Sequence, residues 1–118
     1  MTLEEITEKA RTYAREYWDM DLDALIVINP QFSQILGRVF LSENGYRIEF
    51  CTGFVMGEYS DIAVEKIIKH ELCHWALMKK GLPYYDGNPF FEAELERIGA
   101  GSWTNPYSSN CIRNFIYS

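Results

Sequence analysis

Residues 67–75 read Ile67-Ile68-Lys69-His70-Glu71-Leu72-Cys73-His74-Trp75, inside the longest helix that the sequence predicts. Capping residues place this helix between about residue 61 and residue 80: Ser60 or Asp61 precedes it, and Gly81 follows it. Side chains four residues apart project from one helix face, so His70 and His74 can contact a single ion. The chain has 2 histidines, and both are in this helix.

The pattern His-Glu-x-x-His is typical of a catalytic zinc site. Two neutral imidazoles would bind the ion, and Glu71 could deprotonate a water molecule without binding the ion itself. The helix is otherwise apolar, so without a metal these polar groups would lie near a core with no assigned partner. We therefore expect His70 and His74 as zinc ligands and Glu71 as the catalytic base.

A catalytic zinc needs a third protein ligand, and the chain has no third histidine. Four carboxylates that follow the motif are candidates: Asp86, Glu92, Glu94 and Glu96. Asp86 is in the loop after the helix and could reach the metal if the loop folds back. Glu94 follows His74 by twenty residues, a spacing that some metalloproteases use, whereas Glu92 and Glu96 suit a solvated helix face.

The other elements predict a single α+β domain over residues 1–118, with a small antiparallel or mixed sheet of about three strands packed against the helices. We expect an amphipathic helix over residues 3–18 with a capping box at Thr2, a buried strand over residues 24–29, and a third helix that begins after Asn88. A short helical turn should follow Asn29, and a loop should pass through Gly53 and Gly57. The residues from Trp103 onward are apolar enough to pack back on the domain.

A hairpin is the clearest strand signal in the sequence. Its arms are residues 38–41 and 46–50, and the pair Asn44-Gly45 favours a tight turn between them. In the second arm, alternation predicts one packed face and one wet face that carries Arg47, Glu49 and Cys51.

Composition excludes several classes of protein. The chain has 118 residues, 47% of them hydrophobic, and 17 acidic against 11 basic residues give a net charge of -6. This balance disfavours a general nucleic-acid binder. The start of the chain carries no signal peptide and no apolar run is long enough to span a membrane, so we expect a cytoplasmic protein. The 3 cysteines are far apart and predict free buried thiols.

The chain resembles the SprT-like family of zinc metallopeptidases. The resemblance rests on the order of elements, on the step Leu36-Gly37-Arg38 into the hairpin, on the strand residues 47–50, and on residues 67–75 with Leu-Cys inside the motif. Gly81 and Phe91 also fall in the family's register, and the position of the family's third histidine carries Asp86. A slip of one or two residues would place Gly87 or Asn88 there instead.

The resemblance implies a zincin-like fold and hydrolysis of peptide bonds in a protein or peptide substrate, with zinc on His70, His74 and Asp86. The sequence lacks a second zinc-binding motif after this domain, so we expect a minimal catalytic domain. Eukaryotic relatives cleave proteins crosslinked to DNA, but the negative net charge does not support carrying DNA association over. The alternatives are a degenerate, non-catalytic binding module and a peptidase that uses Glu94 as its third ligand.

Two further features would assist catalysis. Tyr84 or Tyr85 could donate a hydrogen bond to the oxyanion, although packing of the loop also explains them. The strand of residues 46–50 could offer its edge to an extended substrate through main-chain hydrogen bonds.

Overall fold

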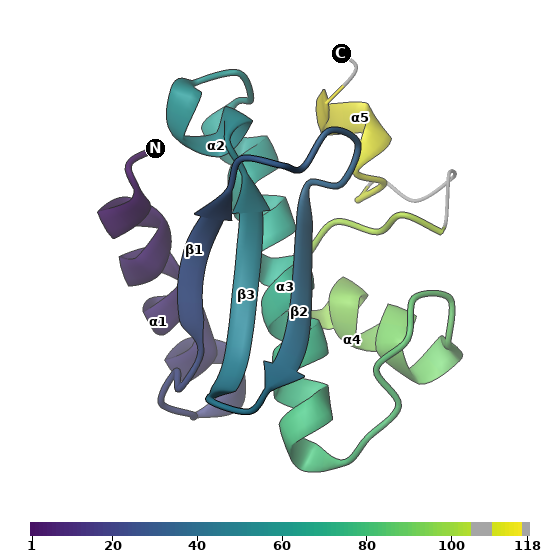
Figure 1. Cartoon of the computed structure of the whole chain (residues 1–118). Helices are drawn as coiled ribbons and strands as arrows, with labels where there is room; N and C mark the ends of the chain where they lie inside the picture. The colour runs from purple at the N-terminus through teal and green to yellow at the C-terminus, as the bar shows by residue number, and fades with distance from the viewer. Residues whose placement is uncertain (105–109, 117–118) are drawn as a thin grey trace.

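A three-stranded sheet and one long helix form the centre of the computed structural model, which describes residues 1–104 and 110–116 (Figure 1). The strands are β1 (Leu25–Asn29), β2 (Gly37–Ser42) and β3 (Gly45–Cys51), in the spatial order β1-β3-β2. Strand β1 pairs with β3 in parallel and β2 pairs with β3 in antiparallel orientation, so the sheet is mixed. The predicted α+β class with a three-stranded sheet is confirmed.

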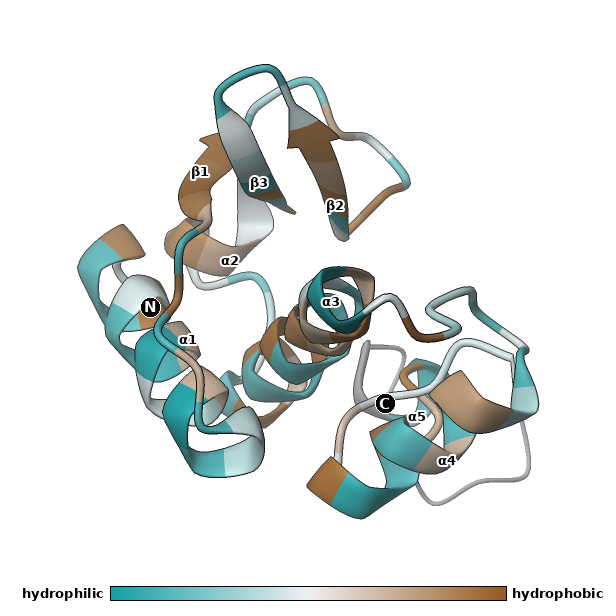
Figure 2. Cartoon of the chain, turned by 90° about the horizontal axis from the view of Figure 1, so that it is seen from below, coloured by the Kyte–Doolittle hydropathy of each residue, from teal (hydrophilic) through white to brown (hydrophobic). Residues whose placement is uncertain are grey.

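The long helix α3 (Asp61–Lys80) lies between the sheet and helix α4 (Pro89–Ile98), and α1 (Leu3–Trp18) lies beside it (Figure 2). Each of these helices begins at the side chain that the sequence predicts. Thr2 and Glu5 form a reciprocal capping box, Ser60 accepts a hydrogen bond from the Ala63 amide, and Asn88 caps α4. Helix α3 ends at Gly81, which has a φ of 67° that favours glycine.

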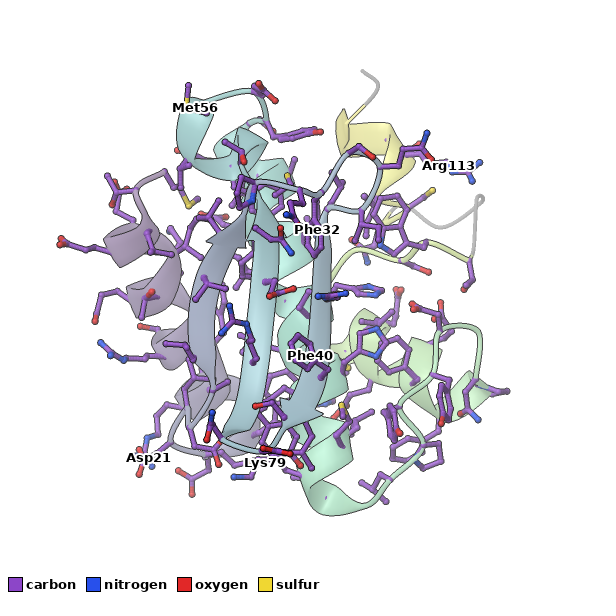
Figure 3. The ribbon with its side chains drawn as sticks, in the orientation of Figure 1. Asp21, Phe32, Phe40, Met56, Lys79 and Arg113 are labelled. Carbon is purple, nitrogen blue, oxygen red and sulfur yellow. The ribbon has the colours of Figure 1, made fainter. Side chains whose placement is uncertain are left out.

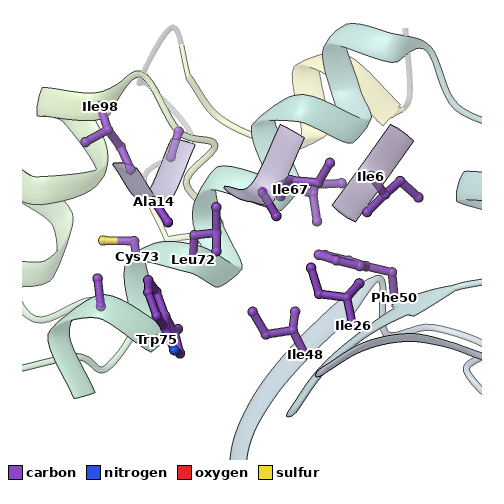
Figure 4. Packing of buried hydrophobic residues seen from close by; sticks show 14 of the residues in the cluster. Ile6, Ala14, Ile26, Ile48, Phe50, Ile67, Leu72, Cys73, Trp75 and Ile98 are labelled. Atoms are coloured by element: carbon purple, nitrogen blue, oxygen red, sulfur yellow. The ribbon is translucent and has the colours of Figure 1, made fainter. Parts of the chain in front are cut away.

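The core lies between the sheet and helices α1 and α3 (Figure 4). Ile48 and Phe50 of β3 are fully buried against this layer, and α3 buries Ile67 and Trp75 in it. The predicted amphipathic character of α1 is also confirmed, since Ile6, Ala10 and Ala14 are buried, although Leu3 at its first position is 39% exposed. Helix α3 is therefore enclosed on two sides, which fixes the orientation of its His-Glu-x-x-His residues.

Two predictions about connecting segments are wrong. The residues after β1 form turns instead of a helical turn, because the Asn29 side chain accepts a hydrogen bond from the Gln31 amide at 2.9 Å and bends the chain at once. The expected loop through Gly53 and Gly57 contains a short helix, α2 (Gly53–Met56). Gly57 ends this helix with a φ of 75°.

The hairpin has the predicted arms, but its turn is displaced by one residue. Ser42 pairs with Gly45, so Glu43 and Asn44 occupy the turn, and Gly45 takes the positive φ of 107°. The Ser42 hydroxyl accepts a hydrogen bond from the Asn44 amide at 3.2 Å, which stabilises this arrangement.

The expectation of a wet outer face on β3 is wrong for Glu49 and Cys51, which are 4% and 6% exposed. The Glu49 carboxylate accepts hydrogen bonds from Arg38 at 2.7 Å, from Arg47 at 2.9 Å and from Asn29 at 3.3 Å. The Arg38 guanidinium in turn lies over the rings of Phe32 and Phe40. Figure 3 shows Phe40 on β2 and Phe32 near the beginning of this strand. Neighbouring strands thus cover the carboxylate.

Strand β3 is central in the sheet, so the expectation that residues 46–50 offer a free edge is wrong. Both edges of β3 are paired, and among the described residues no strand pairs with the outer edge of β2, which lies beside α3. The Cys51 amide donates to the Leu36 carbonyl at 3.0 Å. Because hydrogen-bonding residues alternate along an antiparallel pair, the amides and carbonyls of Gly37, Val39 and Leu41 face the open edge.

The C-terminal segment packs on the domain as predicted, as far as the structure describes it. Ser102 and Cys111 form a parallel bridge, and Ile112 is 1% exposed before the short helix α5 (Arg113–Ile116). The prediction also covers residues 105–109 and 117–118, which lie outside the described residues. Cys51, Cys73 and Cys111 are free and buried, as expected. None of the described helices has the length and apolar character of a bilayer-spanning segment.

Candidate metal centre

His70 and His74 project from the same face of α3, as the spacing predicts. Their Nε2 atoms lie 3.2 Å apart, and their ring planes meet at 70°. His70 is 1% exposed, while the His74 side chain is 15% exposed and borders a groove. His70, Glu71 and His74 offer ligand atoms that all lie within 4.8 Å of one another, a group that could hold a metal ion.

A backbone carbonyl contacts the Nδ1 atom of each imidazole, on the side of the ring away from the other histidine. The carbonyl of Gly101 lies 2.7 Å from Nδ1 of His70, and the carbonyl of Tyr84 lies 2.6 Å from Nδ1 of His74. A carbonyl oxygen only accepts hydrogen bonds, so both Nδ1 atoms must carry the proton. In the neutral rings both Nε2 lone pairs then point toward each other, an arrangement that requires a cation between them or additional protons. This donor set suits a zinc ion.

Asp86 completes the cluster from the loop between α3 and α4. Its Oδ1 lies 3.0 Å from Nε2 of His70, and its Oδ2 lies 3.3 Å from Nε2 of His74. Burial acts to raise the pKa of Asp86, but hydrogen bonds from histidine rings that also carry a proton on Nε2 outweigh it and hold the pKa well below its ordinary value. Burial likewise acts to lower the pKa of His70, but the hydrogen bond to Asp86 and the charges of Glu71 and Asp86 raise it.

Glu71 is 5% exposed, and its Oε2 atom has no hydrogen-bond partner within the described part of the chain. Burial raises the pKa of this carboxyl above its ordinary value, although positive charge on His70 and His74 opposes the shift. A buried carboxylate without a partner is costly, and a water molecule or ion in the cluster would relieve that cost. A raised pKa also suits a group that accepts and returns a proton.

The other three candidate carboxylates form their hydrogen bonds away from the two histidines. Glu94 accepts hydrogen bonds from Trp18 at 3.0 Å and from Arg97 at 2.5 Å, between α4 and α1. Glu92 is not on a solvated face, because it accepts hydrogen bonds from Ser102 and Thr104 at 2.6 and 2.7 Å. Glu96 is exposed, with Asn110 3.5 Å away. The structure thus brings Asp86, and not Glu94, to the histidines.

Sequence reasoning missed the groups that orient the imidazoles. The Phe91 ring stacks on His74 with centroids 4.3 Å apart and meets His70 edge-on at 5.6 Å. The sequence drew attention to Phe91 only through the family resemblance, which assigns it no contact with the histidines. The carbonyls of Gly101 and Tyr84 give no signal in the sequence, because every residue has a carbonyl.

The cluster lies in the middle of a cleft formed by two adjoining hollows that share Gly37, Glu71 and Asp86. One hollow, of about 430 Å³, extends along β2 toward Leu41 and is bordered by His74, Met78, Tyr84 and Tyr85. The other, of about 300 Å³, is bordered on the opposite side by residues 34–36, Ile67 and Trp103. The cleft therefore continues in both directions from Glu71.

No protein-family model, curated protein or solved structure matches the chain. Support for a function therefore comes from the geometry of the cleft and from the sequence pattern of residues 67–75.

Tyr84 and Tyr85 border the larger hollow, but their rings stack on each other at 4.5 Å and their hydroxyl oxygens are 3.4 Å apart. The Tyr84 carbonyl, rather than its hydroxyl, contacts His74. Both phenols border the same hollow as His74 and Asp86, which is compatible with a hydrogen bond to the oxyanion. The stacked rings also agree with the alternative interpretation, in which the tyrosines pack the loop.

Proposed function

We propose that the chain is a zinc-dependent endopeptidase of the SprT-like type, with a zincin-like fold. The observation that supports it is the convergence of His70, His74 and Asp86 beside the buried carboxylate of Glu71, whose Oε2 atom has no hydrogen-bond partner among the described residues. His70, His74 and Asp86 would hold the metal. When bound, a zinc ion polarises a carbonyl and makes a water molecule more acidic.

Glu71 would act as general base and then as general acid. Its carboxylate accepts a proton from the attacking water, whose oxygen bonds to the carbonyl carbon of the substrate. The proton then passes to the amide nitrogen as the carbon–nitrogen bond breaks, releasing an amine and a carboxylic acid. Burial raises the pKa of Glu71 above its ordinary value, which strengthens the carboxylate as an acceptor of the proton from the attacking water.

The open edge of β2 would hold the substrate. The amides and carbonyls of Gly37, Val39 and Leu41 can pair with an extended peptide, and this edge borders the cleft beside Glu71. Because the cleft continues on both sides of Glu71, a chain could pass through it and be cut internally. Main-chain pairing selects extended segments and reads little sequence.

The test is to compare the wild type with Glu71→Gln. The wild type should carry about one zinc per chain and cleave unfolded casein, whereas Glu71→Gln should keep the metal and lose cleavage. Elemental analysis measures the first property, and release of peptides measures the second. If both proteins carry zinc and both leave casein intact, the peptidase proposal is wrong and the binding-module alternative stands.

A further inference from the structure

The larger hollow ends in a surface that the proposed chemistry does not use. Glu71, His74 and Met78 form one stripe of α3 along its floor, and Met78 is two turns beyond Glu71. Seven residues of helix rise about 10 Å, and three residues of extended chain span about the same distance. A substrate side chain about three residues from the cleaved bond would therefore reach Met78.

Apolar side chains border this end from both sides. Leu41 of β2 is 61% exposed on one rim and Tyr85 is 67% exposed on the other, with Val39 and Met78 half-buried between them. A contiguous apolar patch beside a hollow is typical of a binding surface. Val39 and Leu41 also have their main-chain groups at the open edge, so a paired peptide would lie directly against these side chains.

The same end offers no charged partner among the residues that border it. Of the three charged residues along the hollow, Glu71 and Asp86 belong to the metal cluster and Arg38 donates to Glu49. Lys79 follows Met78 in sequence, but its ammonium group is bound to Asp23. A charged substrate side chain would lose water here without gaining a partner.

We infer that this end of the hollow is a subsite for a bulky apolar side chain, and that the substrates are exposed apolar segments of unfolded proteins. The inference rests on the proposed function, because it assigns the specificity of the same cleft. A leucine, methionine or phenylalanine about three residues from the cleaved bond would contact Leu41, Met78 and Tyr85. Burial of such a side chain should tighten binding about tenfold.

Peptide binding to the zinc-loaded Glu71→Gln variant tests the inference separately from cleavage. The probes are fluorescent peptides of one extended sequence that carry either leucine or aspartate at the tested position, read by anisotropy. The leucine peptide should bind about tenfold more tightly than the aspartate peptide. Leu41→Ser, added to Glu71→Gln, removes the apolar surface without adding a charge that would repel the aspartate peptide, so it should shrink this difference severalfold.

Leu25→Ser is the matched control, because Leu25 is 59% exposed on the other edge strand, β1, and does not border the cleft. It should leave the tenfold preference unchanged. Equal binding of the two peptides to Glu71→Gln, or an equal loss of preference in both leucine variants, would overturn the subsite. If the preference is present but the wild type cleaves neither peptide nor casein, only the proposed hydrolysis fails.

Discussion

The backbone of Gly37 lies directly against the side chain of Glu71. A β-carbon on Gly37 would lie 2.9 Å from Cγ and 3.3 Å from Cδ of Glu71, and 3.2 Å from Cδ1 of Phe50. Real β-carbons essentially never approach other atoms as closely as 2.9 Å, so a side chain at this position would move the carboxylate. The first residue of β2 therefore sets where Glu71 sits relative to the two histidines.

Gly37→Ala should lower kcat about 10- to 100-fold with little change in zinc content, because the carboxylate moves while the ligands remain in place. The variant should also lose about 1–3 kcal/mol of stability, since the methyl group overpacks the core. Steady-state cleavage of casein-derived peptides and elemental analysis measure the two effects. Ile48→Val is the control, because Ile48 is buried in the same sheet and does not border the cleft. An unchanged kcat in Gly37→Ala would contradict the positioning role.

Asp86→Ala and Glu94→Ala should separate the two candidate third ligands. Asp86→Ala removes the carboxylate that contacts both imidazoles and should weaken zinc binding by more than about 100-fold. Glu94→Ala breaks the contacts with Trp18 and Arg97, so it should cost about 1 kcal/mol of stability and leave zinc affinity unchanged. Competition with a chromophoric chelator measures the affinities. Retention of zinc by Asp86→Ala would refute Asp86 as a ligand.

Glu92 connects the two segments that support the cluster. It accepts hydrogen bonds from Ser102, next to the Gly101 carbonyl that holds His70, and from the amide of Gly87, next to Asp86, at 3.2 Å. Glu92→Gln loses acceptor capacity and cannot satisfy all these donors. We therefore expect zinc affinity to fall about tenfold while the ligands stay intact.

Glu96→Gln is the matched control for this change, because Glu96 is an exposed glutamate on the same helix. Chelator competition on both variants should show a loss for Glu92→Gln alone. Cobalt substitution adds a spectroscopic measurement, since a shifted ligand sphere alters the visible absorption. Equal zinc affinities in the two variants would mean that Glu92 has no part in holding the site.

Local signals predicted most of the helices and the helical part of the site. Thr2, Ser60, Asn88 and Gly81 each act on the few residues around them, so their effects can be read from sequence. The i, i+4 spacing of the histidines likewise needs only a helix. Capping residues also predicted the loop that carries Asp86. The direction in which this loop folds depends on contacts with His70 and His74, which are distant in sequence. The sequence alone therefore could not decide which carboxylate is the third ligand.

Non-local pairing explains what the sequence did not predict. The parallel pairing of β1 with β3 joins residues more than twenty positions apart and places β3 in the centre of the sheet, so the open edge falls on β2. The same pairing brings Asn29 beside Glu49 and helps to bury a carboxylate that alternation assigns to a wet face. Neither result follows from the hairpin sequence, because the partner strand is elsewhere in the chain.

The buried Glu49 carboxylate should make stability depend on pH. Burial acts to raise its pKa, but hydrogen bonds from Arg47, Asn29 and Arg38 outweigh this and lower the pKa below the ordinary value of 4.5. A lowered pKa in the folded state means that the carboxylate stabilises the fold above pH 4.5, and that this contribution is lost as the pH falls through the folded-state pKa.

Glu49→Gln should therefore reduce the free energy of unfolding by about 1–3 kcal/mol at pH 7, because it removes charge-assisted hydrogen bonds. The difference from the wild type should shrink below pH 4.5, where the wild-type carboxylate begins to take up a proton. Urea unfolding at several pH values between 3 and 7 measures it. Glu43→Gln, at the exposed turn of the same hairpin, should change stability little at pH 7. A Glu49→Gln difference that stays constant with pH would show that the carboxylate's charge does not contribute to the stability of the sheet.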